Sequence, residues 1–547
     1  MRVKSLSLLA GISIAISAMI LCSHPVLGQA SCLTEAEVKR MLAQINGPQP
    51  ASLDNMMRKK LLKIKENDQK RFQTTVQQGK ASEVLLAEMK ASREKNTLLL
   101  CPLLKEFGWP TRALVGDDGA AAAFLLLKNS SSFALQRSLL PVVIAATRKG
   151  EIEKSSFAGY LDNLRLRSGL KQLFGTQTTI MDGFLVLFPI ANESLVDDRR
   201  KQFDLPPLAD YLRLLEYRYN LPLIRAPGKL ANKFVEDSQN PIAKATTLFE
   251  GEELEENEVV RISSDLVSIN VSVYDQRLRT HVGRLTREDF TVLEDGQPQT
   301  ISFFASTDVP FDLVLLIDLS GSTVGKRDLI RKSTRRFVEA ARPSDRVAIV
   351  TFWDTTDVIS PLTANHQELL EKIANIKGTG GSHVWDALKF TLDQVLGPKS
   401  LERRRAIVFM TDGVDNAFMG YQPGGSVGSA ITFSQLLDAV RRTDVLVIPI
   451  YLDTESDGGP PWQRWYANAR KTLGLLAEES GAPFYQARKI EDLDGVYTQV
   501  LNDLGQVYSL GYKPTNTKHD GLWRSVAIKV ANHPELTTRS RPGYDAK

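Results

Sequence analysis

A short pattern of acidic and hydroxyl side chains follows the apolar run of residues 313–317. It consists of Asp318, Ser320 and Ser322, in the spacing D-x-S-x-S. A carboxylate and two hydroxyls are hard oxygen donors, and such donors suit Mg²⁺, Mn²⁺ or Ca²⁺. Because the pattern alone arises often by chance, its meaning depends on the elements that position it.

Two further polar residues stand at comparable places later in the chain. Asp412 follows the apolar run 406–410, between a threonine and a glycine, and Ser382 ends the glycine-rich stretch 378–382. In open α/β sheets, ligands bind at the carboxyl ends of the strands. We therefore expect Asp318 and Asp412 to lie at the same edge of one sheet.

The elements around these residues predict an α/β domain over residues 309–507. Four apolar runs lack alternation and are separated by helical stretches; they are residues 313–317, 347–352, 406–410 and 445–451. Strands that are apolar on both sides are typical of a parallel sheet covered by helices on both faces. The fold class that we expect is a doubly wound, Rossmann-like domain.

The flanking segments predict strands of another kind. Apolar and polar residues alternate over 267–273, and Glu294-Asp295-Gly296 indicates a hairpin turn. The tail after residue 508 is again strand-like but too short to build a core alone. We infer that residues 261–308 and 508–547 form two halves of one small β-sandwich, into which the α/β domain is inserted.

The amino-terminal half predicts a mainly helical domain, residues 29–225. Its first helix begins at Thr34, which can cap the helix and is followed by acids in the first turn. Residues 226–260 contain prolines and an acidic run and indicate a linker. Glu151 and Asp162 of the helical domain are examples of acids that could form a catalytic carboxylate pair, but we interpret both as surface acids.

The first 28 residues predict an export signal. Arg2 and Lys4 precede an apolar run over residues 6–21. At about 16 residues this run is shorter than the ~20 that a membrane-spanning helix needs. We expect a cleaved signal peptide, a secreted or periplasmic protein, and no transmembrane span in the mature chain. An uncleaved amino-terminal anchor is the alternative.

Two cysteines would remain after removal of the signal, Cys32 and Cys101. An even pair in an oxidising compartment is compatible with one disulfide. Two free, buried thiols are the alternative, so both interpretations stay open.

The set D-x-S-x-S, a loop hydroxyl and T-D-G resembles the metal-ion-dependent adhesion site of the von Willebrand factor type A family. The resemblance implies that Asp318, Ser320 and Ser322 ligate a divalent cation, most naturally Mg²⁺, with Asp412 bound directly or through water. The family's loop threonine corresponds here to Ser382. Thr379 is the alternative. A protein partner would supply an Asp or Glu carboxylate as a further ligand.

Five neighbours of this site receive other interpretations. Asp354 and Asp357 are interpreted as ordinary loop carboxylates, and His383 as a structural or solvated residue at the rim. Asp415 and Asn416 are interpreted as turn residues.

Two wider resemblances cover most of the chain. Residues 262–547 are similar to a bacterial family related to von Willebrand type A proteins, on marks such as Gly511-Tyr512 and Arg541-Pro542-Gly543-Tyr544. Residues 33–220 are similar to a domain family of unknown function, on stretches such as Gly108-Trp109-Pro110-Thr111. That family often has Gln-His-Ala-Asp at the position where this chain has Leu127-Lys128-Asn129-Ser130, so any role of that histidine is lost here.

Three functions follow from these features. The first is an exported adhesion or binding protein that captures an acidic residue of a protein partner through a cation. The second is a scaffold or assembly factor of an envelope complex. The third is an enzyme that uses the helical domain, but residues 29–280 contain no histidine for a triad or zinc site. A net charge of only +4, without a basic cluster, argues against nucleic acid. We therefore expect that this protein is not an enzyme.

Overall fold

The computed structural model divides the chain into two compact units. The first comprises residues 1–182, 186–211 and 233–258, and the second comprises residues 183–185, 212–232 and 259–547. The structure describes residues 31–50, 52–77, 82–237, 239–246, 266–275, 280–281, 285–374, 376–396, 402–419, 428–453, 460–487, 492–531 and 533–546. The expected signal peptide, residues 1–28, lies outside the described residues. In the part that is described, no helix is both long and apolar enough to cross a membrane.

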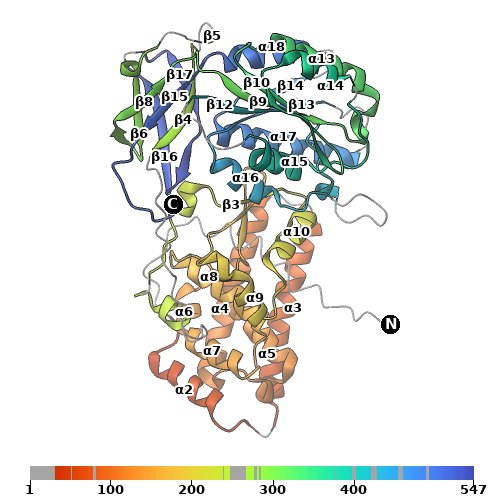
Figure 1. Ribbon diagram of the computed structural model, residues 1–547. Coiled ribbons are helices and arrows are strands. Elements are labelled where there is room, and N and C mark those ends of the chain that lie inside the picture. The colour runs from red at the N-terminus through yellow and green to blue at the C-terminus, as the bar shows by residue number, and fades with distance from the viewer. Residues whose placement is uncertain are drawn as a thin grey trace. The chain divides into compact units, whose positions relative to one another are not determined.

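The first unit is mainly helical, as expected (Figure 1). Its elements are α2 (Glu35–Asn46), α3 (Asn55–Gln77), α4 (Ser82–Phe107), α5 (Arg112–Lys128), α6 (Phe133–Ser138), α7 (Leu140–Arg148), α8 (Lys154–Arg167), β1 (Thr178–Met181), η2 (Glu193–Leu195), α9 (Val196–Gln202) and α12 (Pro241–Thr246). Two more elements, β2 (Phe184–Leu187) and α10 (Leu208–Tyr219), contain residues of both units. Thr34 caps α2, with its hydroxyl accepting from Glu37 N at 3.3 Å.

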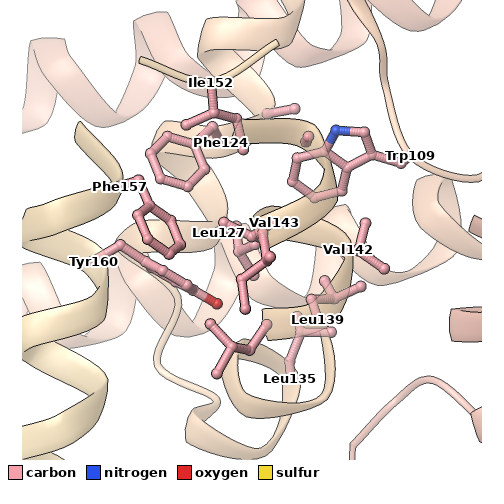
Figure 2. Packing of buried hydrophobic residues seen from close by; sticks show 14 of the residues in the cluster. Trp109, Phe124, Leu127, Leu135, Leu139, Val142, Val143, Ile152, Phe157 and Tyr160 are labelled. Carbon is pink, nitrogen blue, oxygen red and sulfur yellow. The ribbon is translucent and has the colours of Figure 1, made fainter. Parts of the chain in front are cut away.

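Aromatic and aliphatic side chains from α2 to α8 form the core of this unit. Figure 2 shows Phe124, Phe157 and Tyr160 grouped with leucines and valines. The rings of Phe124 and Tyr160 lie 5.7 Å apart, centre to centre. A disulfide joins Cys32, ahead of α2, to Cys101 on α4. Of the two interpretations of the cysteines, the structure has the disulfide.

The second unit contains the predicted α/β fold. In the described chain, six strands pair in the order β11-β10-β9-β12-β13-β14. Their bounds are β9 (Phe311–Asp318), β10 (Arg346–Phe352), β11 (Thr356–Thr363), β12 (Arg404–Thr411), β13 (Leu446–Leu452) and β14 (Tyr485–Ala487). All neighbours are parallel except β10 and β11. Every residue of β9 is buried, as the unbroken apolar run predicts.

Helices cover both faces of this sheet (Figure 1). One face packs against α13 (Arg327–Ala340), α14 (His366–Ile373) and α18 (Leu493–Leu504). The other is covered by α15 (Val384–Phe390), which continues into a π-helical turn over Thr391–Val395, and by α16 (Phe433–Arg441) and α17 (Pro460–Ser480). This arrangement is the doubly wound architecture expected from the sequence.

The flanking strands form a two-sheet sandwich from both sides of the α/β domain. One sheet has the order β17-β4-β15-β8, with β5 paired to β4, and the other has the order β18-β16-β6-β7. The bounds are β4 (Val267–Asp275), β5 (Thr280–His281), β6 (Phe290–Glu294), β7 (Gln297–Gln299), β8 (Ile301–Ala305), β15 (Val507–Tyr512), β16 (Trp523–Val530), β17 (Leu536–Ser540) and β18 (Gly543–Asp545). The predicted insertion is confirmed, because β15 pairs with β4 and β8.

A buried arginine joins the sandwich to the α/β sheet. Arg404, the first residue of β12, donates to Ser509 Oγ at 2.8 Å and to the carbonyl of Ala305 at 3.1 Å. These acceptors belong to β15 and β8, the strands that leave and enter the α/β domain. The inserted domain is therefore held at both of its ends.

Residues 212–232 belong to the same unit. They contain β3 (Leu223–Arg225) and α11 (Gly228–Ala231). Arg225 Nε donates to Asp438 Oδ2 on α16 at 2.6 Å, and Asn232 exchanges two hydrogen bonds with the backbone of Trp523. The segment that we expected to be a linker, residues 226–260, thus contains α11 and α12, and its residues 247–260 lie outside the described chain.

Candidate metal site

The two central strands of the α/β sheet end side by side at the D-x-S-x-S turn. β9 and β12 are parallel, with Ile317 paired to Met410. Asp318 Oδ2 accepts from Thr411 Oγ1 at 2.7 Å, and Asp318 Oδ1 accepts from Ser320 N at 2.9 Å. Both oxygens of this carboxylate are therefore oriented by neighbours from two adjacent strand ends.

Two buried carboxylates at this edge of the sheet repel each other electrostatically. Asp318 is 0% exposed and Asp412 is 2% exposed. Burial, and next the negative charge of Asp412, raise the pKa of Asp318 above its usual value. Two carboxylates held close together away from water destabilise each other. A bound cation would offset both the burial and the repulsion, so the charges of this pair fit a metal ion.

Hydroxyl groups complete the same edge. Ser320 is buried and Ser322 is exposed, and their Oγ atoms lie 3.3 Å apart. Ser320 is the N-cap of the short 3₁₀ helix η4 (Gly321–Lys326). The backbone N of Gly321 donates to the carbonyl of Gly380 at 3.0 Å, which joins the D-x-S-x-S turn to the glycine-rich loop.

Ser382 is buried, and its hydroxyl makes no hydrogen bond with any residue that the structure describes. Its backbone, in contrast, is fixed to the loop after Asp412. Ser382 N donates to Asn416 Oδ1 at 3.3 Å, and Asn416 N donates to the carbonyl of Ser382 at 3.0 Å. Leaving a buried hydroxyl unpaired is costly, so this atom needs a partner. A cation is a partner of the right chemistry.

The structure thus brings the five expected residues onto three neighbouring loops. These residues are Asp318, Ser320, Ser322, Ser382 and Asp412. Their role as ligands stays a prediction. In the described part of the chain, no three His, Cys, Asp or Glu side chains gather into a metal cluster. That result is compatible with this site, because it pairs only two carboxylates with three hydroxyls.

Asp354 has a positioning role that sequence analysis missed. Its Oδ1 accepts from Gly381 N at 2.9 Å and lies 3.9 Å from Nε2 of His383. The two residues on either side of Ser382 are therefore in contact with, or near, one carboxylate. Asp357, interpreted as a loop residue, lies in strand β11 instead.

Asp415 is more than a turn residue. It is fully buried and accepts from Ser429 Oγ at 2.6 Å, from Ala417 N at 2.8 Å and from Trp385 N at 3.2 Å. Burial raises the pKa of Asp415 above its usual value. The carboxylate anchors the loop that carries Asp412 to the start of α15. Because Ser429 lies far along the sequence, no local pattern predicts this contact.

The interpretation of Asp162 as a surface acid is wrong. It is fully buried on α8 and accepts from the backbone of Leu173, Phe174 and Thr176. The Thr176 hydroxyl also donates to it, at 2.8 Å. The carboxylate therefore holds the chain between α8 and β1 in place. Glu151, the second such acid, accepts from Arg112 N at 2.6 Å.

Comparison with known families agrees with this geometry. Residues 313–414 match the model of the von Willebrand factor type A domain. This chain contains a von Willebrand factor type A domain. The match begins in β9 and ends just beyond β12, so it includes all five residues of the candidate site. The von Willebrand factor type A domain supports a binding role for the protein.

The first unit matches a family as well. Residues 55–224 match a family of unknown function, DUF6624. The resemblance to the von Willebrand factor type A family is therefore confirmed over residues 313–414, and the resemblance to a family of unknown function over residues 55–224.

Solved structures show slight similarity to the chain. Proximal thread matrix protein 1 from the mussel byssus, in a structure with a zinc-occupied MIDAS motif, is 16% identical over 36% of this chain and 48% of its own, with a TM-score of 0.28. The von Willebrand domain of the type V pili tip protein Mfa5 from Porphyromonas gingivalis is 14% identical over 35% and 94%, with a TM-score of 0.28. BatB from Bacteroides thetaiotaomicron is 12% identical over 36% and 98%, with a TM-score of 0.28. The chain spans about half the length of the mussel protein.

Proposed function

We propose that this is an exported binding protein whose von Willebrand factor type A domain holds a divalent cation and captures an acidic residue of a protein partner. The observation that carries the proposal is the buried, unpaired hydroxyl of Ser382 beside the mutually repelling pair Asp318 and Asp412. A buried hydroxyl oxygen without a partner and two crowded carboxylates are both unfavourable without a cation. We propose Mg²⁺ as the natural ion, with Mn²⁺ or Ca²⁺ as alternatives, because every donor is an oxygen.

The residues of the chain would share this work as follows. Asp318, Ser320, Ser322 and Ser382 would hold the ion, with Asp412 as a ligand directly or through water. When bound, the ion supplies positive charge that attracts a carboxylate. Two carboxylates balance a divalent ion without adding net negative charge, so the site does not repel an acidic partner.

The remaining contacts keep these donors in place. Thr411 orients Asp318, and Asp354 fixes the backbone of Gly381, next to Ser382. Asp415 anchors the loop after Asp412. Ligands held by such outer contacts need little rearrangement on binding, which favours affinity.

Binding, rather than catalysis, is the role that we propose. In the first unit, the carboxylate oxygens of buried Asp162 accept hydrogen bonds from three backbone N–H groups and one hydroxyl. At the cation site, Asp318 is occupied in the same way by Ser320 and Thr411. Carboxylates held this way position a chain or an ion more readily than they move protons.

Calorimetry of cation binding tests the proposal. The full chain is titrated with Mg²⁺ and with Mn²⁺ as wild type, as Asp318→Ala and as Asp357→Ala. Asp357 is an exposed aspartate of the same domain and serves as the matched control. We expect binding to be lost in Asp318→Ala and retained in Asp357→Ala. Identical traces for wild type and Asp318→Ala would refute the site.

Crosslinking mass spectrometry identifies the partner. Wild type and Asp318→Ala are compared in the native envelope, with and without chelator. A partner that is captured through the cation is crosslinked by wild type alone, and only without chelator. Crosslinks that survive both treatments would contradict a metal-bridged contact.

A further inference from the structure

Three aromatic side chains gather at the amino-terminal end of α17. The ring of Trp462 stands against that of Trp465 at 4.9 Å between centroids and lies 6.4 Å from that of Tyr466. Tyr466 is buried, Trp465 is partly exposed, and 38% of Trp462 is exposed. We call Trp462 and Trp465 the aromatic shelf.

The loop that carries Asp412 rests on the same helix. Val414, two residues after Asp412, packs with Tyr466, Trp465 and Ala469 in one hydrophobic cluster. Gly413 approaches α17 so closely that a Cβ on it would lie 2.7 Å from Leu473 Cδ1, and its φ is +72°. The distance between the site loop and the helix is therefore fixed by packing.

Strand β13 gives a second link between the aromatic residues and the site. Tyr451, near its end, pairs in register with Thr411. Arg470 of α17 lies over the Tyr451 ring, with its guanidinium carbon 5.5 Å from the ring centroid. Because α17 follows β13 in the chain, its first turn starts at the edge where the parallel strands end. The shelf and the candidate metal site therefore share that edge.

The charged residues in the first half of α17 are all basic, which favours an acidic partner over a basic one. Arg464 lies on the exposed side of α17, and Arg470 lies one turn beyond Tyr466. The described first turn of the helix contains no acidic residue. A cationic side chain on the indoles would be repelled by these arginines. An apolar side chain would cover the exposed indole without that repulsion.

We propose that the partner presents two side chains together: an Asp or Glu to the cation, and an apolar side chain, aromatic or aliphatic, to the aromatic shelf. This inference rests on the proposed function and names the chemistry of its partner. Tryptophan is enriched among the residues that dominate binding at protein interfaces, because it covers a large apolar area with few rotatable bonds. The partner's carboxylate would bind the cation, and contact with the aromatic shelf would discriminate between partners with and without an apolar side chain.

Short peptides on a surface test this pairing. Each contains one aspartate and, two residues away, a variable residue that is Phe, Leu, Ser or Lys. The full chain is applied with Mg²⁺ or with chelator. We expect Mg²⁺-dependent capture to be roughly tenfold stronger with Phe and Leu than with Ser and Lys, which corresponds to one well-packed contact.

Two variants assign the preference to the shelf. Trp462→Ala should bind Mg²⁺ like wild type in calorimetry but lose the preference among the peptides. Tyr217→Ala, which removes an exposed ring from α10, should keep it. Capture that is equal for all four peptides, or a preference that survives in Trp462→Ala, would overturn the docking surface.

The remaining outcomes separate the two proposals. Absence of Mg²⁺ binding in wild type would overturn the proposed function itself. Mg²⁺ binding without capture of any peptide would overturn the docking surface and leave the cation site standing. Self-association of wild type that is lost in Trp462→Ala would show that a second copy of the chain covers the shelf, and it would also overturn the proposal.

Discussion

The hydroxyl of Thr411 donates a 2.7 Å hydrogen bond to Oδ2 of Asp318 and so links the carboxyl ends of the two central strands, β12 and β9. The same hydroxyl accepts from Gly413 N at 2.8 Å. One side chain thus orients a candidate ligand and the start of the loop that carries Asp412. Outer residues of this kind tune a metal site without touching the ion.

We predict that Thr411→Val weakens cation binding by about tenfold to a hundredfold, because valine keeps the shape of threonine and loses both hydrogen bonds. Isothermal titration with Mn²⁺ measures the change. Thr411→Ser is the matched control and should bind as wild type does, since the hydroxyl remains. An unchanged affinity in Thr411→Val would show that this contact does not orient the site.

Ser382 gives a prediction in which stability and binding move in different directions. In chelator, Ser382→Ala should be as stable as wild type or more stable, by up to about 1 kcal/mol, because it removes a buried hydroxyl without a partner. Its cation affinity should fall. Urea unfolding in chelator and calorimetry measure the two effects.

Ser382→Thr is the control for that experiment, because it keeps the hydroxyl. It should bind the cation about as tightly as wild type. If Ser382→Ala were instead strongly destabilised in chelator, the hydroxyl would have a structural partner, and the argument for a ligand would fail.

The disulfide of the first unit should add measurably to that unit's resistance to unfolding. Cys32 and Cys101 are 69 residues apart, and closing a loop of that length stabilises a fold by about 4 kcal/mol in the chain-entropy description. The double variant Cys32→Ser and Cys101→Ser should unfold at a lower urea concentration. Circular dichroism at helical wavelengths monitors the transition.

Reductant provides the internal control. It should lower the unfolding midpoint of wild type to that of the double variant and leave the double variant unchanged. Two reactive thiols in the unreduced wild type would contradict the disulfide.

Glu216 should make the stability of the second unit depend on pH. Burial raises the pKa of Glu216 to about 8, from 4.5 in the unfolded chain, and the charge of Asp415 adds to the shift while Arg213 opposes it. The folded state therefore holds an extra proton between these values. Its stabilisation is complete below pH 4.5 and declines as the pH rises through 8.

Glu216→Gln should flatten this decline, because glutamine can still accept from Leu223 N but does not ionise. Unfolding midpoints between about pH 5 and pH 9 measure the slope. Asp210→Asn, at an exposed position of the same helix, should keep the slope of wild type. Equal slopes in wild type and Glu216→Gln would rule out this carboxyl as the source.

The sequence predicts the central strands well because they are apolar on both sides. β9, β10, β12 and β13 coincide with the four unbroken apolar runs. β11 escaped notice because Thr356–Thr363 is an edge strand with mixed polarity and a proline. An edge strand is half solvated, so its residues lack the apolar signal of a buried strand.

At the candidate site, residues were predicted where their role follows from their neighbours in the sequence and missed where it depends on distant residues. Asp318 and Asp412 were predicted together because each directly follows a buried strand. The roles of Asp354 and Asp415 were not, since they depend on Gly381 and Ser429, which lie on other loops. The burial of Asp162 was missed for a similar reason, because its partners lie beyond the end of its helix.

Because the α/β domain is inserted between the two halves of the sandwich, the parts of this protein can fold only in a certain order during synthesis. In one sheet, β15 lies between β4 and β8, and in the other, β16 lies between β18 and β6. Neither sheet can be completed until residues beyond 507 have been synthesised, whereas the α/β sheet needs only residues 311–487. The α/β domain can thus fold while the chain is still being synthesised. The last strands then pair with the first strands of the sandwich, and this pairing fixes both ends of the inserted domain.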